Sequence, residues 1–151
     1  MSEQKKSKQK TTEQERAKHA WHRIEQVDGQ GDSVKQNYGS WARKLPAMIQ
    51  TNGLAQTMAF LCAKGKDHHK LLYQHVSQWM LEKEDGKLLP TLLEEDSGTY
   101  RRRTTEAIAY SLWLRRFAEG KEWGSAQGAD ECWLFVTHGP TTYFSMTLPP
   151  P

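Results

Sequence analysis

Cysteines and long apolar runs are both scarce in this sequence, and each shortage excludes a class of protein. The 151 residues contain two cysteines, Cys62 and Cys132, whose spacing matches no metal-binding pattern. Because Cys62 lies in an apolar segment, we expect it to be a small core residue rather than a reactive thiol. No segment approaches the roughly 20 apolar residues of a membrane-spanning helix. The N-terminus does not resemble a secretory signal. We therefore expect a cytoplasmic protein with no membrane partner.

Catalytic motifs are absent as well. The sequence has no glycine-rich phosphate loop, no G-x-S-x-G motif and no closely spaced cysteine pair. His68 and His69 lack the acidic residues that follow such a pair in metal-dependent phosphohydrolases. His19 and His22 lie three residues apart with glutamates nearby, an arrangement that can bind a metal. We expect no catalytic residue, no metal and no cofactor, and we keep as an alternative a small metal-dependent nuclease that uses His19 and His22.

The composition is that of a soluble globular protein, with 36% hydrophobic and 26% charged residues. A chain of this length is expected to form one domain with a real core. We divide it into a disordered basic tail over residues 1–11, a helical domain over 12–119 and a C-terminal extension over 120–151. The extension contains two short β-prone runs around HGP, which predict irregular structure or a β-hairpin. The sequence assigns no role to this extension.

The segment 43–66 is the expected centre of the domain. Its second half, residues 54–63, is apolar at all but two positions. A helix that is apolar nearly all the way round belongs in a core, because no face is left for water. We expect Asn52 to cap the start of this helix and Gly65 to follow its end.

Apolar residues at helical spacing predict further helices on both sides of this segment. We expect them over residues 12–27, 33–51 and 68–83, and from Ser97 or Thr99 to just before Gly120. Thr12 and Glu15 predict a capping box at the start of the first, and Asp67 is expected to cap the third. The acidic segment 82–98 contains LLPTLLEE, which we expect to form a short helix. The predicted fold class is all-α, a compact bundle of about five to six helices.

Charge is segregated into blocks along the chain. Residues 35–81 hold six Lys or Arg and one acid, residues 82–96 hold two bases and six acids, and residues 97–116 hold five Arg and one acid. His68, His69 and His75 are expected to add positive charge to the first block at lower pH. This pattern indicates a basic surface for a polyanion and a separate acidic surface. Solvated helix faces would give the same pattern, so both interpretations stay open.

One motif is more specific than an apolar helix. It reads Y-x-S-x-A-x-K-L-P-x-x-I-x-x-N-G-L-x-Q-x-x-A-F-L-x-x-K and is formed by Tyr38, Ser40, Ala42, Lys44, Leu45, Pro46, Ile49, Asn52, Gly53, Leu54, Gln56, Ala59, Phe60, Leu61 and Lys64. A second portion, YRRRTTEAIAYSLWLRRFA, covers residues 100–118. With these portions, residues 12–119 resemble the small subunit of the type III-B CRISPR effector, the Cmr complex. The residues after Gly120 depart from the family pattern.

The resemblance implies a compact all-α subunit without an active site of its own. Several copies would stack beside the backbone subunit as a minor filament, and that filament would line the channel that holds guide RNA and target RNA. Base pairing reads the sequence in such a machine, so the protein needs only to hold phosphates. Cleavage of the target would belong to other subunits. The implied partners are other subunits of the complex, further copies of this chain, guide RNA and target RNA.

Phosphate binding requires exposed cations. The candidate RNA-binding residues are Lys18, Arg23, Arg43, Lys44, Lys64, Lys66, Arg102, Arg115 and Arg116. Taken singly, each of them is better explained as a solvated surface cation, but three basic elements together on one small domain favour RNA binding. A protein-interaction scaffold without RNA contact is a further alternative. Four tryptophans fall mainly on apolar stripes and are expected in the core rather than in base stacking: Trp21, Trp41, Trp79 and Trp113.

The acidic block offers a candidate subunit interface. Glu94, Glu95 and Asp96 would meet a basic face of the next copy, head to tail. The same three residues could instead solvate a loop and favour the N-terminus of the last helix through its dipole. The sequence leaves both possibilities open.

Overall fold

The computed structural model of the protein describes residues 10–125, and within them the chain forms six α-helices and no strand. The helices are α1 (Thr12–Asp28), α2 (Asp32–Asn52), α3 (Leu54–Lys64), α4 (Asp67–Leu81), α5 (Leu88–Glu94) and α6 (Ser97–Gly120). The predicted all-α bundle is confirmed, and the short helix expected in the acidic segment is α5. In this part of the chain, no helix has the length and apolar character needed to cross a membrane. The predicted β-hairpin and Cys132 lie outside the described residues.

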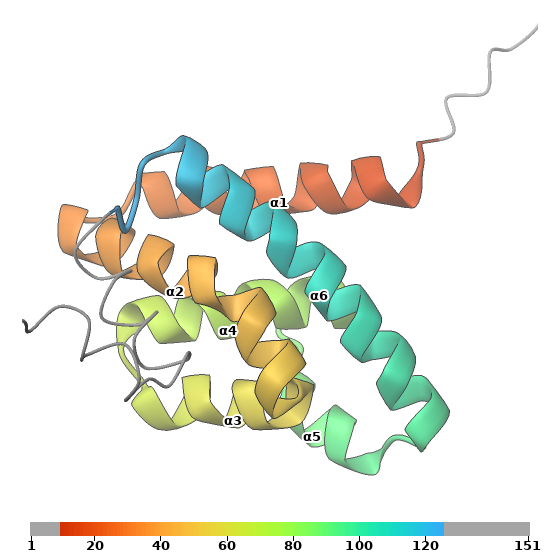
Figure 1. Ribbon diagram of the computed structural model, residues 1–151. Coiled ribbons are helices and arrows are strands. Elements are labelled where there is room, and N and C mark those ends of the chain that lie inside the picture. Colours follow the sequence, from red (N-terminus) through yellow and green to blue (C-terminus); the bar gives the residue numbers. More distant parts are fainter. Residues whose placement is uncertain (1–9, 126–151) are drawn as a thin grey trace, which may run out of the picture.

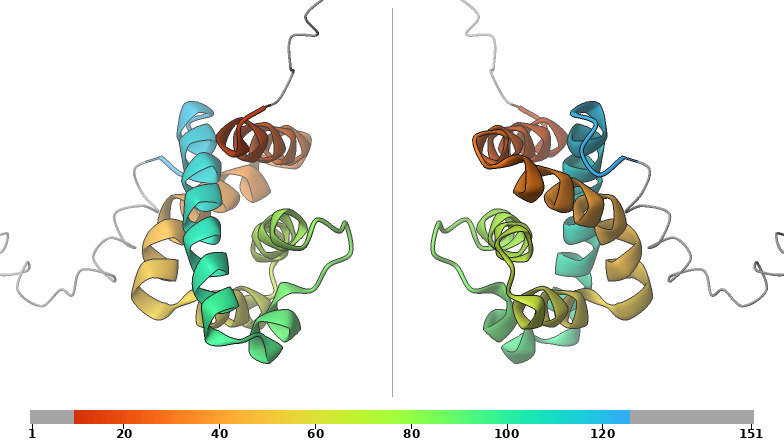
Figure 2. Two further views of the ribbon diagram at one scale, coloured as in Figure 1. Left: turned by 90° about the vertical axis from the view of Figure 1, so that its right-hand side faces the viewer. Right: turned by 90° about the vertical axis from the view of Figure 1, so that its left-hand side faces the viewer.

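α2 and α6 are the longest helices, and they pack extensively against each other (Figure 1). α1 packs along α6 at one end of the molecule, whereas α3 and α5 lie at the opposite end. α4 lies between these ends and contacts all five other helices. The views in Figure 2 show that the bundle crosses at steep angles rather than running parallel. Surface side chains of α2, α3 and α4 can therefore lie together at one side of the molecule.

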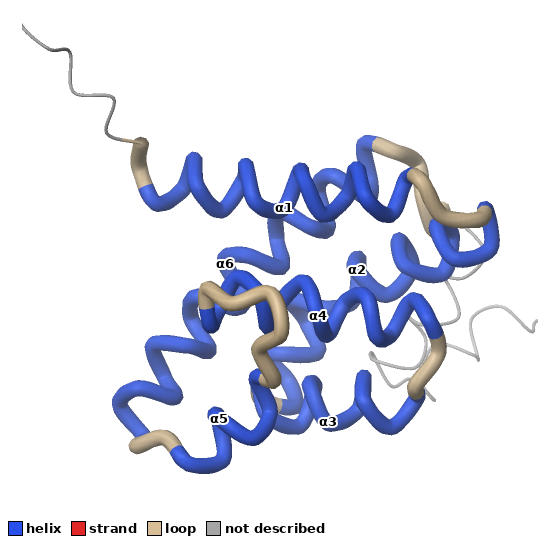
Figure 3. Tube along the Cα trace, turned by 180° about the vertical axis from the view of Figure 1, so that it is seen from behind, coloured by secondary structure: helices blue, strands red, loops and turns tan. Residues whose placement is uncertain are grey.

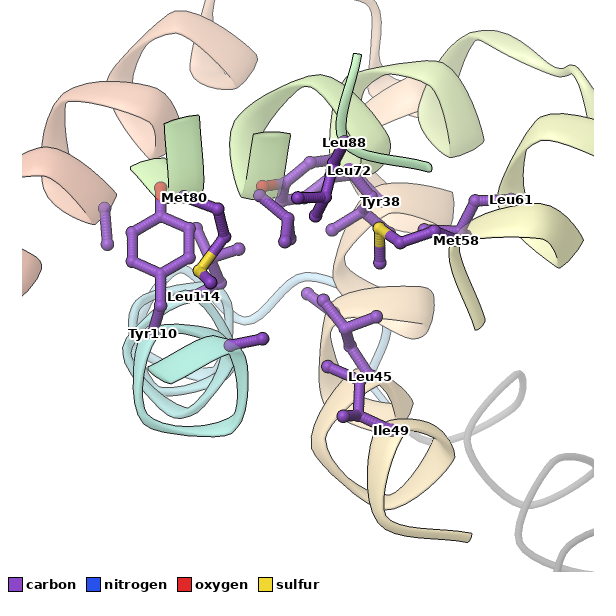
Figure 4. Packing of buried hydrophobic residues seen from close by; sticks show 14 of the residues in the cluster. Tyr38, Leu45, Ile49, Met58, Leu61, Leu72, Met80, Leu88, Tyr110 and Leu114 are labelled. Carbon is purple, nitrogen blue, oxygen red and sulfur yellow. The ribbon is translucent and has the colours of Figure 1, made fainter. Parts of the chain in front are cut away.

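The core is formed by aliphatic side chains together with two buried tyrosines (Figure 4). The hydroxyl of Tyr38 lies 2.8 Å from Nδ1 of His75, and the hydroxyl of Tyr110 lies 2.7 Å from Nδ1 of His19. A buried hydroxyl without a partner is costly, so these two pairs make the tyrosines compatible with the core. The labelled aliphatic residues come from five helices, α2 to α6: Leu45, Ile49, Met58, Leu61, Leu72, Met80, Leu88 and Leu114.

α3 is buried on one side only, which corrects the prediction of a helix buried all round. Its buried residues are Leu54, Thr57, Met58 and Leu61, whereas Cys62 on the outer side is exposed. The prediction fails because α3 lies at an edge of the bundle, where its outward alanines and cysteine cost little in water. Cys62 is therefore not a core residue. Gly65 follows α3 in the left-handed conformation, as predicted.

Helix starts differ from the prediction at three places. The capping box of α1 is formed one residue earlier, by Thr11 and Gln14. Asn52 is the last residue of α2, and Gly53 occupies the N-cap of α3 with φ of 88°, a conformation that favours glycine. Asp67 is the first residue of α4 rather than its cap. Side-chain capping rules identify the helices correctly here but misplace the capping residue.

The chain after α6 turns back onto α2. Trp123 is buried beside Tyr38, with the two rings edge to face at 6.4 Å. Its carbonyl oxygen accepts a hydrogen bond from Nε of Arg43 at 2.9 Å. The next residue, Gly124, donates its N–H to Oε1 of Gln36 at 2.9 Å. Residues beyond the end of α6 thus complete the core.

Candidate nucleic-acid interface

Three of the predicted RNA-binding lysines come together on one surface. Lys64 at the end of α3 and Lys66 before α4 line the same hollow as Trp41 and His69. Lys44 of α2 joins them, with its Nζ 4.2 Å from the centre of the Trp41 ring. Within residues 10–125 none of these three lysines is part of an ion pair. We call Lys44, Lys64, Lys66, Trp41, Phe60 and His69 the basic–aromatic surface.

Helical spacing builds this surface locally. Lys44 follows Trp41 by three residues, and Lys64 follows Phe60 by four, so each lysine lies over the ring of its predecessor. The Trp41 and Phe60 rings are themselves 5.3 Å apart. Lysine stems can lie along such rings while the ammonium groups stay in water. The result is positive charge held above partly buried aromatic rings.

His69 is the buried member of this surface. Its side chain packs against Trp41 at 4.9 Å between ring centres, and the residue is only 2% exposed. Neither ring nitrogen has a hydrogen-bond partner among the described residues. A buried polar group left unpaired costs about 1–3 kcal/mol. Such a group is a candidate for contact with a ligand.

The structure corrects the prediction that the histidines add positive charge to this block, because His68, His69 and His75 are all buried. Burial lowers the pKa of His69 to about 4, helped by His68 and the three lysines nearby. Burial also lowers the pKa of His75 to about 3, with Arg23 and His19 contributing. The pKa of His68 is lowered for the same main reason. These residues therefore stay neutral at physiological pH, and the positive charge of this block comes from its lysines and Arg43.

Three of the other predicted cations have partners inside the protein. Arg23 pairs with Glu84 at 3.1 Å, and Arg115 pairs with Glu119 at 2.9 Å on its own helix. Arg43 donates to the carbonyl of Trp123, as described above. Arg23 therefore joins α1 to the loop after α4, and Arg43 joins α2 to the segment after α6.

The remaining three predicted cations lie apart from the basic–aromatic surface. Arg102 lines a hollow with residues of α1 and α4 and with Glu106 of its own helix. Arg116 lines another hollow with Leu112 and Trp113. Lys18 is exposed on α1. The structure thus separates the nine predicted cations into one cluster of three and several scattered positions.

The predicted interface acids have different environments. Glu95 forms an ion pair with Arg103 of α6 and is largely covered. Asp96 is the N-cap of α6, where its carboxylate accepts the N–H of Thr99 at 2.9 Å. Glu94 is exposed at the end of α5. Two of the three acids therefore serve the fold, and Glu94 remains available at the surface.

His19 and His22 do not form a shared site. Nδ1 of His19 contacts the Tyr110 hydroxyl, and its Nε2 lies 3.5 Å from the guanidinium of Arg23. His22 lies 3.8 Å from Glu25 instead. Within residues 10–125 there is no group of three or more His, Cys, Asp or Glu residues positioned to hold a metal ion.

The tryptophans are less buried than predicted. Trp21 is 39% exposed and contacts Phe117 and Lys121 rather than the core. Trp79 and Trp113 are partly buried, and their indole N–H groups donate to glutamates. These N–H groups explain why Trp79 and Trp113 are only partly buried, because an indole N–H needs a polar partner.

Sequence reasoning missed the aromatic half of the basic–aromatic surface. The sequence predicts Trp41 in the core and His69 only as a source of charge. The available signal was the spacing of Trp41 to Lys44 and of Phe60 to Lys64, which predicts a lysine over a ring on each helix. No local pattern indicates that these two helices bring their rings together.

Comparisons with known proteins agree with the resemblance in the sequence. The family described as CRISPR-associated protein (Cas_Cmr5) matches residues 12–121. Two similar proteins are called CRISPR system Cmr subunit Cmr5. The one from Thermus thermophilus is 31% identical over 73% of this chain and 95% of its own length. The one from Thermotoga maritima is 33% identical over 74% and 85%.

A solved structure is also similar to this fold. The crystal structure of a CRISPR-associated Cmr5 family protein from Thermus thermophilus aligns with a TM-score of 0.68 at 29% identity. The alignment covers 74% of this chain and 97% of that one. The family predicted from the motif around residues 38–64 is confirmed: the chain belongs to the Cmr5 family of CRISPR-associated proteins.

Proposed function

We propose that this protein is a non-catalytic small subunit of a type III-B CRISPR effector complex, in which it holds guide and target RNA through phosphate contacts. Its relatives carry the name of a Cmr subunit. Copies of the chain stack as a minor filament beside the backbone subunit, in the cytoplasm. The observation that carries the RNA contact is the basic–aromatic surface. Its three lysines have no ion-pair partners in the described residues, two of them lie over partly buried aromatic rings, and Lys66 lines the hollow beside Trp41.

The arrangement suits a strand of nucleic acid better than a small substrate. Ammonium groups from the middle of α2, the end of α3 and the start of α4 can follow a phosphate backbone, and such contacts carry no sequence information. Aromatic rings between them offer a face for bases without selecting one. The alternative of a nuclease that uses His19 and His22 is disfavoured, because the nitrogens of His19 already face Tyr110 and Arg23.

The test uses the assembled complex with the full chain. In the variant Lys44→Gln, Lys64→Gln and Lys66→Gln, RNA should be lost at lower salt than in the wild type. Each phosphate contact removed should reduce the slope of log K against log salt by about 0.7 for a single strand, so the slope should fall by about 2. Filter binding or anisotropy over a salt series measures this.

A matched control removes the same charge elsewhere. Lys70, Lys83 and Lys87 are exposed and lie outside the basic–aromatic surface. Their replacement by Gln should leave the salt slope close to that of the wild type. An equal loss in both triple variants would mean that net charge alone acts. No loss in either, with normal assembly, would favour a scaffold without RNA contact.

A further inference from the structure

Two helices begin at the same side of the molecule without a side-chain cap. Gly31 before α2 and Lys66 before α4 supply no capping hydrogen bond. The first backbone bonds are those of Lys35 to Gly31 and Lys70 to Lys66. In the described part of the chain, the N–H groups of residues 32–34 and 67–69 therefore have no acceptor. Figure 3 shows α2 and α4 starting at this shared side.

Both first turns line one hollow, which we call the α2–α4 hollow. Ser33 and Asn37 contribute from α2, and the start of α4 contributes from the other side. The positive ends of two helix dipoles thus face a common space, which favours an anion. Lys64 and Lys66 line the same hollow and add positive charge. Asp67 is the acidic residue in this lining.

A second observation indicates a ligand that offers hydrogen-bond donors and acceptors as well as negative charge. His69 lines the hollow, is almost fully buried, and has two ring nitrogens without partners among the described residues. A neutral imidazole carries one donor and one acceptor. A phosphodiester offers acceptors only, whereas a nucleobase offers both donors and acceptors at its edge. Trp41 beside His69 supplies an aromatic surface for the base.

The hollow is open and has a volume of about 600 Å³. This size lies within the range of small-molecule sites and exceeds what a phosphate needs. A base that is already paired and stacked in a duplex cannot present its edge to a buried histidine. The occupant must therefore be unpaired.

We propose that the α2–α4 hollow binds one unpaired nucleotide of the RNA, with its phosphate at the starts of α2 and α4 and its base beside Trp41 and His69. The inference rests on the proposed function for the identity of the strand. It goes beyond that function because the site selects an unpaired nucleotide rather than any phosphate backbone.

Nuclear magnetic resonance titration of the full chain tests this site directly. Uridine 5′-monophosphate should shift the amide signals of residues 32–34 and 67–69 and the indole signal of Trp41. Inorganic phosphate should shift the amides but leave the indole signal in place. An RNA hairpin whose only unpaired bases lie in a stable tetraloop should bind more weakly than single-stranded hexauridylate. Absence of shifts at these amides with the mononucleotide would overturn the proposal.

Two variants sharpen the result. His69→Phe keeps a ring of similar size and removes both nitrogens, so the mononucleotide should bind about tenfold more weakly while phosphate binds as before. Asp67→Asn removes the carboxylate, so both anions should bind about threefold more tightly. Weaker anion binding in Asp67→Asn, or equal nucleotide binding in His69→Phe, would contradict the proposal.

The two proposals fail in different ways. If the triple lysine variant releases RNA from the complex and His69→Phe binds nucleotide as the wild type does, the proposed function stands and the nucleotide site is wrong. If His69→Phe loses the mononucleotide while the triple lysine variant retains RNA in the complex, the nucleotide site stands and the proposed function is wrong.

Discussion

Gly39 of α2 lies in direct contact with Trp123, so closely that a Cβ atom on Gly39 would come 2.3 Å from Cβ of Trp123. Gly124 approaches the same stretch of α2, where its own Cβ would lie 2.3 Å from the backbone nitrogen of Ser40. Both close approaches involve backbone or the first side-chain atom, which cannot swing aside. Residues 123 and 124 can therefore lie against α2 only because positions 39 and 124 are glycine.

Replacement of Gly39 by alanine should destabilise the protein. The methyl group must push the segment around Trp123 off α2, because the atoms that it meets are rigid. We expect a loss of about 1–3 kcal/mol in the free energy of unfolding, as for other overpacked sites. Urea denaturation followed by tryptophan fluorescence measures it. Gly120→Ala is the control, since nothing lies within 4 Å of its Cβ position and alanine favours the helix. Equal stability of the two variants would contradict the contact.

Tyr100 caps α3 from a distance of 45 residues in the chain. Its hydroxyl accepts the N–H of Ala55 at 3.0 Å and lies near Gly53. Tyr100→Phe leaves this N–H unpaired beneath the ring and should cost about 1–2 kcal/mol. Hydrogen exchange of the first turn of α3 should also become faster. Thr105→Ala on the exposed side of the same helix should change stability by less than about 0.5 kcal/mol; an equal effect would argue against the cap.

Glu106 ties three helices together. Its carboxylate accepts from Nε of Arg16 at 2.6 Å and from Nε1 of Trp79 at 2.8 Å. Both of these bonds go to Oε1, and Oε2 accepts from Nη2 of Arg16 at 2.8 Å. Glu106→Gln replaces one of the two oxygens by a donor, so at least one of the three bonds is lost, and we expect a loss of about 1–3 kcal/mol at pH 7. Glu13→Gln, at an exposed pair with Arg16, should cost less than about 1 kcal/mol.

The stabilisation by the Glu106 carboxylate depends on pH. The hydrogen bond from Arg16, followed by that from Trp79, lowers the pKa of Glu106 below its ordinary value of 4.5. Its stabilisation is therefore complete above pH 4.5 and is lost as the pH falls through the lowered value. Thermal unfolding of the wild type and of Glu106→Gln should converge in that acidic range. A constant difference across the series would show that the carboxylate charge is not involved.

The helices were predictable from the sequence because apolar spacing and capping residues act locally. The packing order was not. The segment 54–63 reads as a core helix, but its position at the edge of the bundle depends on how α2 and α6 pair, which no local pattern encodes. The core tyrosines can be buried only because His19 and His75, which belong to other helices, lie within hydrogen-bond distance of their hydroxyl groups. These pairings require the tertiary structure.

The site was predictable in part for the same reason. A basic block predicts exposed lysines, and Lys44, Lys64 and Lys66 were named from it. The block does not show that Arg23 and Arg43 turn inward, since their partners are more than 60 residues away in the chain. The unpaired His69 and the shared hollow also follow only from the meeting of α2 with α4.

The predicted subunit interface at Glu94 can be tested without disturbing the fold. It is exposed beside Leu93, which is 69% exposed, whereas Glu95 and Asp96 hold α6. Glu94→Arg should therefore lower the number of copies in the assembled complex while leaving the isolated protein as stable as the wild type. Native mass spectrometry counts the copies. Asp85→Arg reverses an exposed charge in the loop before α5 and serves as the control. An unchanged copy number in Glu94→Arg would remove Glu94 from the interface.

His75 should make the protein acid-sensitive. Its pKa falls from 6.5 to about 3 on folding, mainly through burial, so the unfolded chain binds a proton that the folded chain does not. Stability is therefore complete above about pH 6.5 and falls as the pH drops toward 3, by about 1.4 kcal/mol per pH unit for this group in the middle of the range. His19 and His69, whose pKa values are lowered to about 4 mainly by burial, add to the loss in the same direction. Urea denaturation at intervals between pH 7 and 4 measures the slope.

His75→Asn separates this effect from packing. The amide can still meet the Tyr38 hydroxyl but cannot take up a proton, and the smaller side chain should lower stability at pH 7 by about 1–3 kcal/mol. The diagnostic quantity is the slope of stability against pH, which should be shallower than in the wild type whatever the starting stability. His22→Asn makes the same substitution at an exposed ring and is the matched control. A wild-type slope retained in His75→Asn would mean that other groups cause the acid sensitivity, and the neutral, buried state of His75 would lose its support.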